Sequence, residues 1–145
     1  MNNLSTHGIV AIVRNVTGKF LLLEDARDQM RGHWAPPHGR CEDSDITEEN
    51  GVIREVKEEC GLKSVVIEKP LIKTFHTYTE KNKSILKKTH WYSMYAEGDQ
   101  ILIPQTEEDI EKAKWMTKEK ILDKVYSNTY LAVKEVLNAN FKLIG

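Results

Sequence analysis

The sequence predicts a mixed α/β (α+β) fold, with residues 1–145 forming a single domain. The chain has the ordinary length of one domain that can bury a proper core. Short apolar runs typical of strands lie on both sides of one central segment with helical periodicity, and a second helical segment closes the chain. No repeat, low-complexity tract or Pro/Gly/Ser linker divides the sequence. These observations favour one mixed sheet built around one central helix.

A strand pair and a loop are expected before the central helix. Residues 8–14 (G-I-V-A-I-V-R) and 19–24 (K-F-L-L-L-E) are apolar runs typical of strands, and residues 15–18 between them are typical of a turn. The loop that follows, residues 25–40, carries Trp34 and two prolines.

The central helix is predicted over residues 47–60. Asp45 or Thr47 could cap its start, because both side chains can accept a hydrogen bond from a free backbone N–H of the first turn. Gly61 is expected to stop the helix, since glycine readily takes the left-handed conformation that follows a last turn.

The second half is predicted to supply further strands and two helices. Strand segments over residues 65–67 and 71–78 are expected to be interrupted at Pro70, and a polar turn over residues 81–83 leads into a long strand over residues 84–96. After a charged loop come a strand at residues 114–116, a helix capped by Thr117, and a last helix that starts at Asn128 or Thr129. The residues of this last helix expected to face the core are Leu131, Val133, Val136 and Leu137.

Three carboxylates converge on one side of the central helix. At about 100° per residue, Glu55, Glu58 and Glu59 share roughly 100° of arc, and the apolar side chains Val52, Ile53, Val56 and Cys60 fall on a different arc that would face the core. Like charges at this spacing repel, and a divalent cation would relieve the repulsion. Hard oxygen ligands suit Mg²⁺ or Mn²⁺. The alternative is a solvated acidic face, and Gly51 on the same arc would let a loop backbone come close.

Composition excludes several classes of function. A net charge of −1 gives no general attraction to nucleic acid or anionic lipid, and 40% hydrophobic residues with 30% charged residues is typical of a soluble globular protein. The apolar run at residues 9–13 is too short for a signal segment or a membrane span. Two cysteines form no disulfide framework and no zinc-binding spacing, so reduced thiols and a cytoplasmic location are expected, with Cys60 in the core.

The run R-E-V-K-E-E-C-G-L at residues 54–62, with Gly39 upstream in W-A-P-P-H-G-R, resembles the signature of the Nudix hydrolases. We call residues 39–62 the acidic box. The resemblance implies a Nudix-type α/β/α sandwich with a mixed sheet and a central catalytic helix. It also implies a Mg²⁺-dependent (or Mn²⁺-dependent) pyrophosphohydrolase, which cleaves a nucleoside diphosphate linked to another moiety.

The resemblance also implies roles for individual residues. Glu58 and Glu59 would bind the metal with the carbonyl of Gly39, and Glu55 would bind it directly or through water and is a candidate general base. Arg54 would hold Glu55 by a charge-assisted hydrogen bond.

The box and its surroundings leave two assignments open. The spacing from Gly39 to Arg54 is one residue longer than in the family, so the acid in the middle of the box is either Asp45, for which capping is an equal alternative, or nearby Glu42. The further acid that often completes such sites is expected to be Glu108, against Glu97 or Asp99.

The stretch H-W-A-P-P-H-G-R-C-E at residues 33–42 resembles the equivalent loop of the diadenosine tetraphosphate hydrolases. His38 stands where that group carries lysine, which would make phosphate affinity depend on pH near neutrality. Arg40 or Lys88 could supply permanent charge to the polyphosphate. In K-K-T-H-W-Y-S-M, Trp91 or Tyr92 could stack on a base, or both could simply pack in the sheet.

Two other functions stay open at this point. One is the same chemistry on a nucleoside triphosphate, a nucleotide sugar or a diphosphoinositol phosphate. The other is a non-catalytic Nudix module that binds a nucleotide or a partner protein. The expected partner is a small-molecule nucleotide substrate rather than a nucleic acid polymer or a membrane, and the protein is expected to be a monomer or homodimer.

Overall fold

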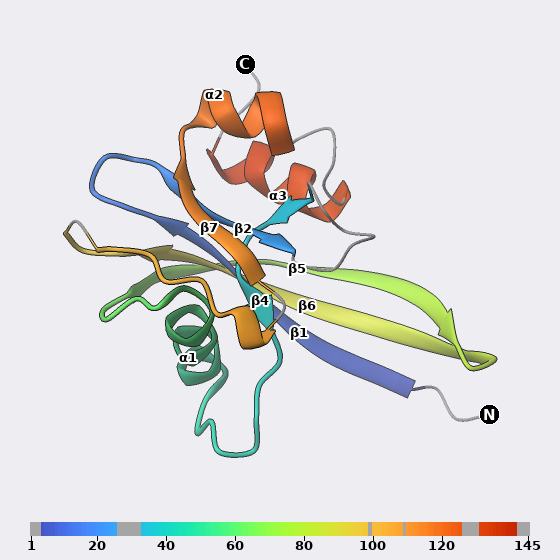
Figure 1. Ribbon diagram of the computed structural model, residues 1–145. Helices are drawn as coiled ribbons and strands as arrows, with labels where there is room; N and C mark the ends of the chain where they lie inside the picture. Colours follow the sequence, from blue (N-terminus) through green and yellow to red (C-terminus); the bar gives the residue numbers. More distant parts are fainter. Residues whose placement is uncertain (1–3, 26–32, 99, 109, 126–130, 142–145) are drawn as a thin grey trace.

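The computed structural model describes residues 4–25, 33–98, 100–108, 110–125 and 131–141. It contains a mixed sheet with helices on both faces (Figure 1). Helix α1 (Glu48–Cys60) covers one face. Helices α2 (Lys118–Lys120) and α3 (Leu131–Phe141) cover the other, with a π-helical turn, η3 (Ile121–Val125), after α2. The predicted α/β/α sandwich is therefore confirmed.

The centre of the sheet is a long parallel pair, β1 (Leu4–Arg14) and β6 (Lys83–Tyr95). Strand β5 (Val66–Glu80) pairs antiparallel with the far side of β6, and β2 (Phe20–Asp25) pairs antiparallel with β1. The remaining strands are β3 (Trp34–Ala35) and β7 (Ile110–Met116), which pair with β2, and β4 (His38–Gly39), which pairs with β1. The order β3-β2-β1-β6-β5 mixes parallel and antiparallel neighbours.

Alternation of side chains along the central strands creates two cores. Ile9, Ala11 and Val13 of β1 pack with Val52 and Val56 of α1. The intervening Ile12 belongs to a second cluster on the other face. That second cluster includes Phe20, Trp91, Ile121, Val136 and Leu137. Since successive strand residues point to opposite faces, each central strand serves both cores, and α1 is held against the sheet by the first.

The structure corrects the prediction that a strand is interrupted at Pro70. Strand β5 runs unbroken from Val66 to Glu80, and its pairing with β6 shifts register next to Pro70. Proline lacks a backbone donor but is tolerated on an edge strand or at a bulge. The predicted polar turn holds Lys81 and Asn82, whose positive φ angles of 51° and 63° fit a two-residue hairpin.

Several predicted boundaries move. Strand β1 starts at Leu4, and β7 starts at Ile110. The predicted loop over residues 25–40 contains the two-residue strands β3 and β4, which the sequence did not indicate. The predicted start of the last helix, Asn128 or Thr129, lies outside the described residues. Within that helix Val133, Val136 and Leu137 are buried as expected.

Candidate active site

Both ends of α1 are set by the residues that flank it. The Thr47 hydroxyl accepts a hydrogen bond of 3.1 Å from the Asn50 N–H, which makes Thr47 the N-cap. Gly61 ends the helix with a φ of 69° and donates its N–H to the carbonyl of Lys57. Thr47 rather than Asp45 therefore caps the helix, and Asp45 is available for another role.

That role is to hold Arg54. Both oxygens of Asp45 accept hydrogen bonds from the Arg54 guanidinium at 3.0 Å, one from Nε and one from an Nη. The Glu42 N–H also donates to Asp45, at 2.7 Å. The hydrogen bonds from Arg54, the larger effect, and from the Glu42 N–H hold the pKa of Asp45 below its usual range. Asp45, and not Glu42, is the principal carboxylate partner of this arginine.

Arg54 also joins the rest of the box. Its guanidinium donates to Glu55 at 3.3 Å, to Glu58 at 3.1 Å and to the carbonyl of Arg40 at 3.0 Å. The hydrogen bond with Asp45 is the main reason that the pKa of Arg54 rises above its usual value. The expected contact between Arg54 and Glu55 is present, as one of several that Arg54 makes.

Gly39 lies directly against Glu55. A Cβ atom added at residue 39 would come within 2.3 Å of the Glu55 carboxyl carbon and within 2.6 Å of both its oxygens. Glycine at this position therefore lets the Glu55 carboxylate reach the backbone of β4. A Cβ at Gly51 would meet the Cys41 sulfur at 2.8 Å and an Asp45 oxygen at 3.1 Å. The atoms nearest to Gly51 therefore belong to loop side chains, and not to the loop backbone that was expected there.

The three box glutamates differ in exposure. The side chain of Glu58 is 49% exposed, that of Glu55 is 14% exposed, and Glu59 is buried at 5%. The shared helical arc therefore does not place all three in solvent. A segment that follows β6 reaches the end of α1, where the backbone N–H of Gln105 donates to the carbonyl of Glu59 and that of Ile103 donates to the carbonyl of Cys60.

The segment that bonds to the end of α1 continues to Glu108, the acid expected to complete the site from outside the acidic box. Glu108 is the last residue of the short 3₁₀ helix η2 (Thr106–Glu108), which follows directly on the residues bonded to the end of α1. The side chain of Glu108 lies outside the described residues, as does Asp99. Glu97 is exposed, and its carbonyl accepts a hydrogen bond from Gln100.

The proposed phosphate contacts occupy two places. His38 is exposed on β4, with its Nδ1 at 2.9 Å from the Pro36 carbonyl, and Arg40 is exposed directly after β4. Lys88 lies on β6 opposite His7 of β1. Lys88, His90 and Tyr92 alternate along β6, so they point to the same face of the sheet, the one that α1 covers.

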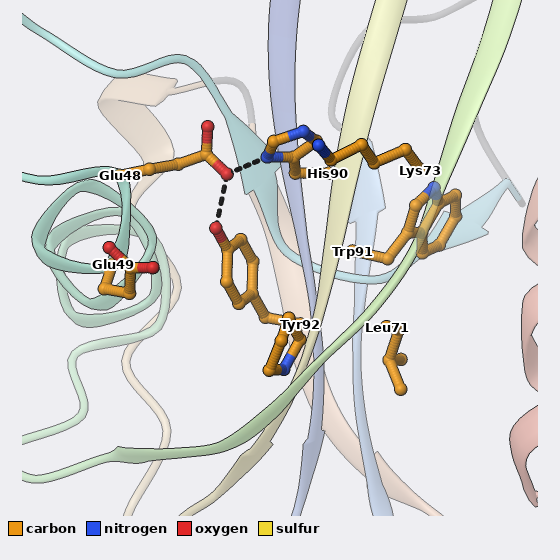
Figure 2. Close-up of a pocket in the computed structure, with 8 residues that line it drawn as sticks. Glu48, Glu49, Leu71, Lys73, His90, Trp91 and Tyr92 are labelled. Atoms are coloured by element: carbon orange, nitrogen blue, oxygen red, sulfur yellow. Dashed lines mark hydrogen bonds and ion pairs between the residues drawn. The ribbon is translucent and has the colours of Figure 1, made fainter.

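A pocket of about 300 Å³ opens between the start of α1 and strands β5 and β6 (Figure 2). Its lining residues are Glu48, Glu49, Pro70, Leu71, Lys73, His90, Trp91 and Tyr92. Trp91 and Tyr92 are 3% and 4% exposed as whole residues and belong to the two opposite cores. Both aromatic residues are therefore packed in the sheet, and the pocket reaches only parts of them.

Glu48 contacts three polar side chains from distant parts of the chain, and the sequence did not predict that they lie together. Its carboxylate accepts hydrogen bonds from the Tyr92 hydroxyl and from Nδ1 of His90 (Figure 2), and lies 3.5 Å from Nε2 of His7. Burial opposes ionisation of Glu48, but these hydrogen bonds outweigh it and hold the pKa below its usual range. Burial and Glu48 together raise the pKa of Tyr92.

We call His7, Glu48 and His90 the histidine cluster. Among the described residues it is the one group of three potential metal ligands whose donor atoms all lie within 4.8 Å of one another. The box glutamates are not gathered that closely, because Arg54 lies between Glu55 and Glu58. No motif or spacing in the sequence indicates the cluster, since its members come from β1, α1 and β6.

The cysteines and the helices bear on where the protein is located. Cys41 is exposed and Cys60 is buried, and neither of them forms a disulfide bond. Within the described part of the chain, none of the helices has the length and apolar character needed to cross a membrane.

Comparison with known proteins agrees with this geometry. A family model described as the NUDIX domain matches residues 5–135, and no curated protein sequence matches the chain. A C. elegans Ap4A hydrolase binary complex is similar in structure, with a TM-score of 0.68, 20% identity, and 92% of this chain and 93% of that chain covered.

Two other solved structures share the fold. A MutT protein from Methanosarcina mazei Go1 has a TM-score of 0.57 and 21% identity, with 88% of this chain and 89% of that one covered. The NUDIX domain of Shewanella oneidensis NrtR, solved with ADP ribose, has a TM-score of 0.66 and 16% identity, with 97% of this chain and 90% of that chain covered. At these identities the likeness concerns the fold.

Proposed function

This chain belongs to the NUDIX domain family of pyrophosphate-bond hydrolases, and we propose that it cleaves a dinucleoside polyphosphate such as diadenosine tetraphosphate with the help of Mg²⁺ or Mn²⁺. The observation that carries the catalytic part is the arrangement around Arg54. One guanidinium joins Asp45, Glu55 and Glu58, with Glu55 packed against Gly39. This arrangement supports a reaction centre formed by the acidic box.

The residues of the box fit a hard divalent cation. Glu55, Glu58 and Glu59 offer carboxylate oxygens, which Mg²⁺ and Mn²⁺ prefer. Arg54 supplies a single positive charge beside several carboxylates, so the group keeps negative charge for a cation. Glu58, Glu59 and the Gly39 carbonyl would hold the ion, with Glu55 bound directly or through water and Glu108 as the further acid. When bound, such an ion neutralises phosphate charge and acidifies water.

Glu55 is the residue we propose as general base. Its carboxylate is held on one side by Arg54 at 3.3 Å and is packed against Gly39 on another, so its orientation is restricted. It would accept a proton from the attacking water while the water oxygen bonds to phosphorus. The bond from that phosphorus to the bridging oxygen then breaks, and the leaving nucleotide keeps the electron pair. Arg54 orients Glu55 and is therefore a positioning residue.

The loop at residues 33–42 supports the choice of substrate. Its residues resemble those of the diadenosine tetraphosphate hydrolases, and it leads directly into the acidic box. The exposed His38 and Arg40, together with Lys88, are the residues we propose to contact the polyphosphate chain. The pocket beside Pro70, Leu71 and Tyr92 offers partly apolar walls for a base.

The second candidate substrate is ADP-ribose. The observation that favours it is the NrtR NUDIX domain, which covers almost the whole of this chain and was solved with that compound. A non-catalytic nucleotide-binding module is the remaining alternative. The presence of Arg54 and of all three glutamates argues against it.

The deciding experiment is a nucleotide panel with chromatographic identification of the products. We expect diadenosine tetraphosphate to be preferred over ADP-ribose and to yield ATP plus AMP, with activity lost in excess chelator. Glu55→Gln should lose most of the activity, whereas Glu111→Gln, which changes an exposed glutamate on β7, serves as the matched control. Preference for ADP-ribose would remove the substrate assignment. Full activity in chelator, or no hydrolysis of any member of the panel, would remove the mechanism.

We also propose the wider setting of the protein. Neither Cys41 nor Cys60 forms a disulfide bond, which suits a reducing compartment and supports a cytoplasmic location. Residues 1–145 would form a single Nudix domain, acting on a small nucleotide as a monomer or homodimer.

A further inference from the structure

The histidine cluster joins three elements at one point. His7 comes from β1, Glu48 from the first turn of α1 and His90 from β6. Strands β1 and β6 are parallel neighbours in which Ile9 stands opposite His90, so the two histidines come from adjacent positions in the sheet. Both side chains point to the α1 face, because His7 alternates with the core residue Ile9, and His90 with Tyr92.

The donor atoms already have nearly the spacing that a metal ion requires. Nε2 of His7 lies 3.5 Å from Oε2 of Glu48, Nδ1 of His90 contacts Oε1, and the imidazole rings are 5.0 Å apart at 83°. Bonds of 2.0–2.1 Å in a tetrahedral site would place two ligand atoms about 3.3 Å apart. Small side-chain adjustments of His90 and Glu48 would therefore bring all three atoms around one ion.

We propose that His7, Glu48 and His90 form a second divalent-cation site, which takes a transition metal such as Zn²⁺ or Co²⁺ in preference to Mg²⁺. Two imidazole nitrogens and one carboxylate are a ligand set that these borderline metals favour, whereas Mg²⁺ favours oxygen ligands. The set differs in chemistry from the all-oxygen acidic box. It does not depend on the proposed function.

The site is also separate in space from the acidic box. Glu48 precedes Glu55 by seven residues, which is two helical turns or about 10 Å along α1. The Tyr92 hydroxyl bonds to Glu48 and orients its carboxylate, as a second group behind a metal ligand commonly does. The side chain of His7 is 53% exposed, so an ion can reach the site and keep water or another ligand in its open position.

Binding an ion here would have a structural consequence. The ion would join the first turn of α1 to the two central strands, β1 and β6, at the wall of the pocket (Figure 2). An ion that binds only the folded chain shifts the unfolding equilibrium by mass action. Zn²⁺ should therefore raise Tm in a way that requires the imidazoles.

The test is Co²⁺ binding in excess Mg²⁺, followed by equilibrium dialysis and by the visible absorption of the bound Co²⁺. We expect the wild-type chain to retain about one equivalent of Co²⁺ that Mg²⁺ does not displace, because imidazole ligands discriminate against Mg²⁺. His7→Ala and His90→Ala should each weaken this binding by at least about tenfold. His76→Ala, an exposed histidine on β5 outside the cluster, should leave it unchanged.

Two further variants separate the sites and guard against misfolding. A chain carrying Glu55→Gln and Glu58→Gln should still bind Co²⁺, and Zn²⁺ should still raise its Tm. The exposed His7 can be replaced with little risk to the fold, so His7→Ala decides the matter if His90→Ala does not fold by circular dichroism. The proposal is overturned if no Mg²⁺-resistant Co²⁺ binds, if binding survives His7→Ala unchanged, or if binding is lost in the Glu55/Glu58 variant.

Discussion

The two ends of helix α1 hold two polar groups of different origin. At the C-terminal half, Arg54 gathers Asp45, Glu55 and Glu58, all of which lie within ten residues of it in the chain. At the first turn, Glu48 gathers His7 and His90, which are 41 and 42 residues away. One group is local in sequence, and the other exists only because β1 and β6 pair beside the helix.

The two groups also differ in the partners that their carboxylates have. In the acidic box an arginine holds the carboxylates through a fixed fork of donors, and the group remains rich in negative charge. In the histidine cluster the carboxylate accepts hydrogen bonds from an imidazole and a hydroxyl, and imidazole nitrogens can also bind a metal. The oxygen ligands of the acidic box suit a hard cation, whereas the histidine cluster suits a softer ion.

The largest effect is expected at Glu55, on the box side of this comparison. Glu55→Gln removes the proposed general base and should lower kcat by about 10² to 10⁴. Since the change preserves shape, the circular dichroism spectrum should stay the same. Steady-state hydrolysis of diadenosine tetraphosphate at fixed free Mg²⁺ measures it. Turnover close to that of the wild type would assign the proton transfer to another group.

Gly39→Ala tests whether the approach of Glu55 to the backbone matters. The new Cβ would lie 2.3–2.6 Å from the Glu55 carboxyl group, so that carboxylate must move. A displacement of about 1 Å in a reacting group can lower the rate by about 100-fold. The expected result is a fall in kcat of that size with little change in Tm, measured by kinetics beside thermal unfolding. A normal kcat would show that the position of Glu55 tolerates the shift.

Arg54→Lys tests whether the arginine acts through its fork geometry. Lysine keeps the charge but cannot make the paired hydrogen bonds to Asp45, so Glu55 and Glu58 lose their common partner. We expect kcat to fall by about 10- to 100-fold, as for other groups that orient ligands. Adding Asp45→Asn to the Arg54→Lys chain should lower kcat little further, because both changes break the same hydrogen bonds. If each substitution lowered kcat by its own factor and the two factors multiplied in the double variant, Arg54 and Asp45 would not act through their shared contact.

The smallest effect is expected at an ion pair away from both groups. Arg14 of β1 donates to Glu68 of β5 at 2.8 Å, and Ser93 donates at 3.0 Å. Burial of Glu68 opposes ionisation, but these hydrogen bonds outweigh it and hold the pKa below its usual range. A lowered folded-state pKa stabilises the fold above the unfolded value of about 4.3, and this stabilisation is lost as pH falls through the folded value.

Glu68→Gln should therefore cost about 0.5 kcal/mol of unfolding free energy at pH 7, since a partly exposed pair is screened by solvent. The cost should shrink below about pH 4, while kcat stays unchanged at pH 7. Urea unfolding at the two pH values measures the first effect, and the hydrolysis assay measures the second. A pH-independent cost would mean that packing, rather than charge, is lost.

Much of the acidic box could be predicted from the sequence because its parts are close in the chain. The helix over Glu48–Cys60, its stop at Gly61 and the shared arc of Glu55 and Glu58 follow from residue spacing alone. The sequence also indicated the α/β/α sandwich through its resemblance to the Nudix family, and the family match over residues 5–135 confirmed that family. The catalytic roles of these residues stay predictions.

Tertiary structure decided what depends on contacts between distant segments. The segment around Gln105 bonds to the end of α1, and Glu59 in that last turn is buried, although its helical position alone predicted an outward carboxylate. Asp45 became the partner of Arg54 because the loop before α1 folds back onto the helix. Pro70 stayed inside β5 because an edge strand tolerates a missing donor. The histidine cluster depends on the pairing of β1 with β6. Sequence periodicity predicts which face of a strand a histidine lies on, but not which turn of the helix it meets.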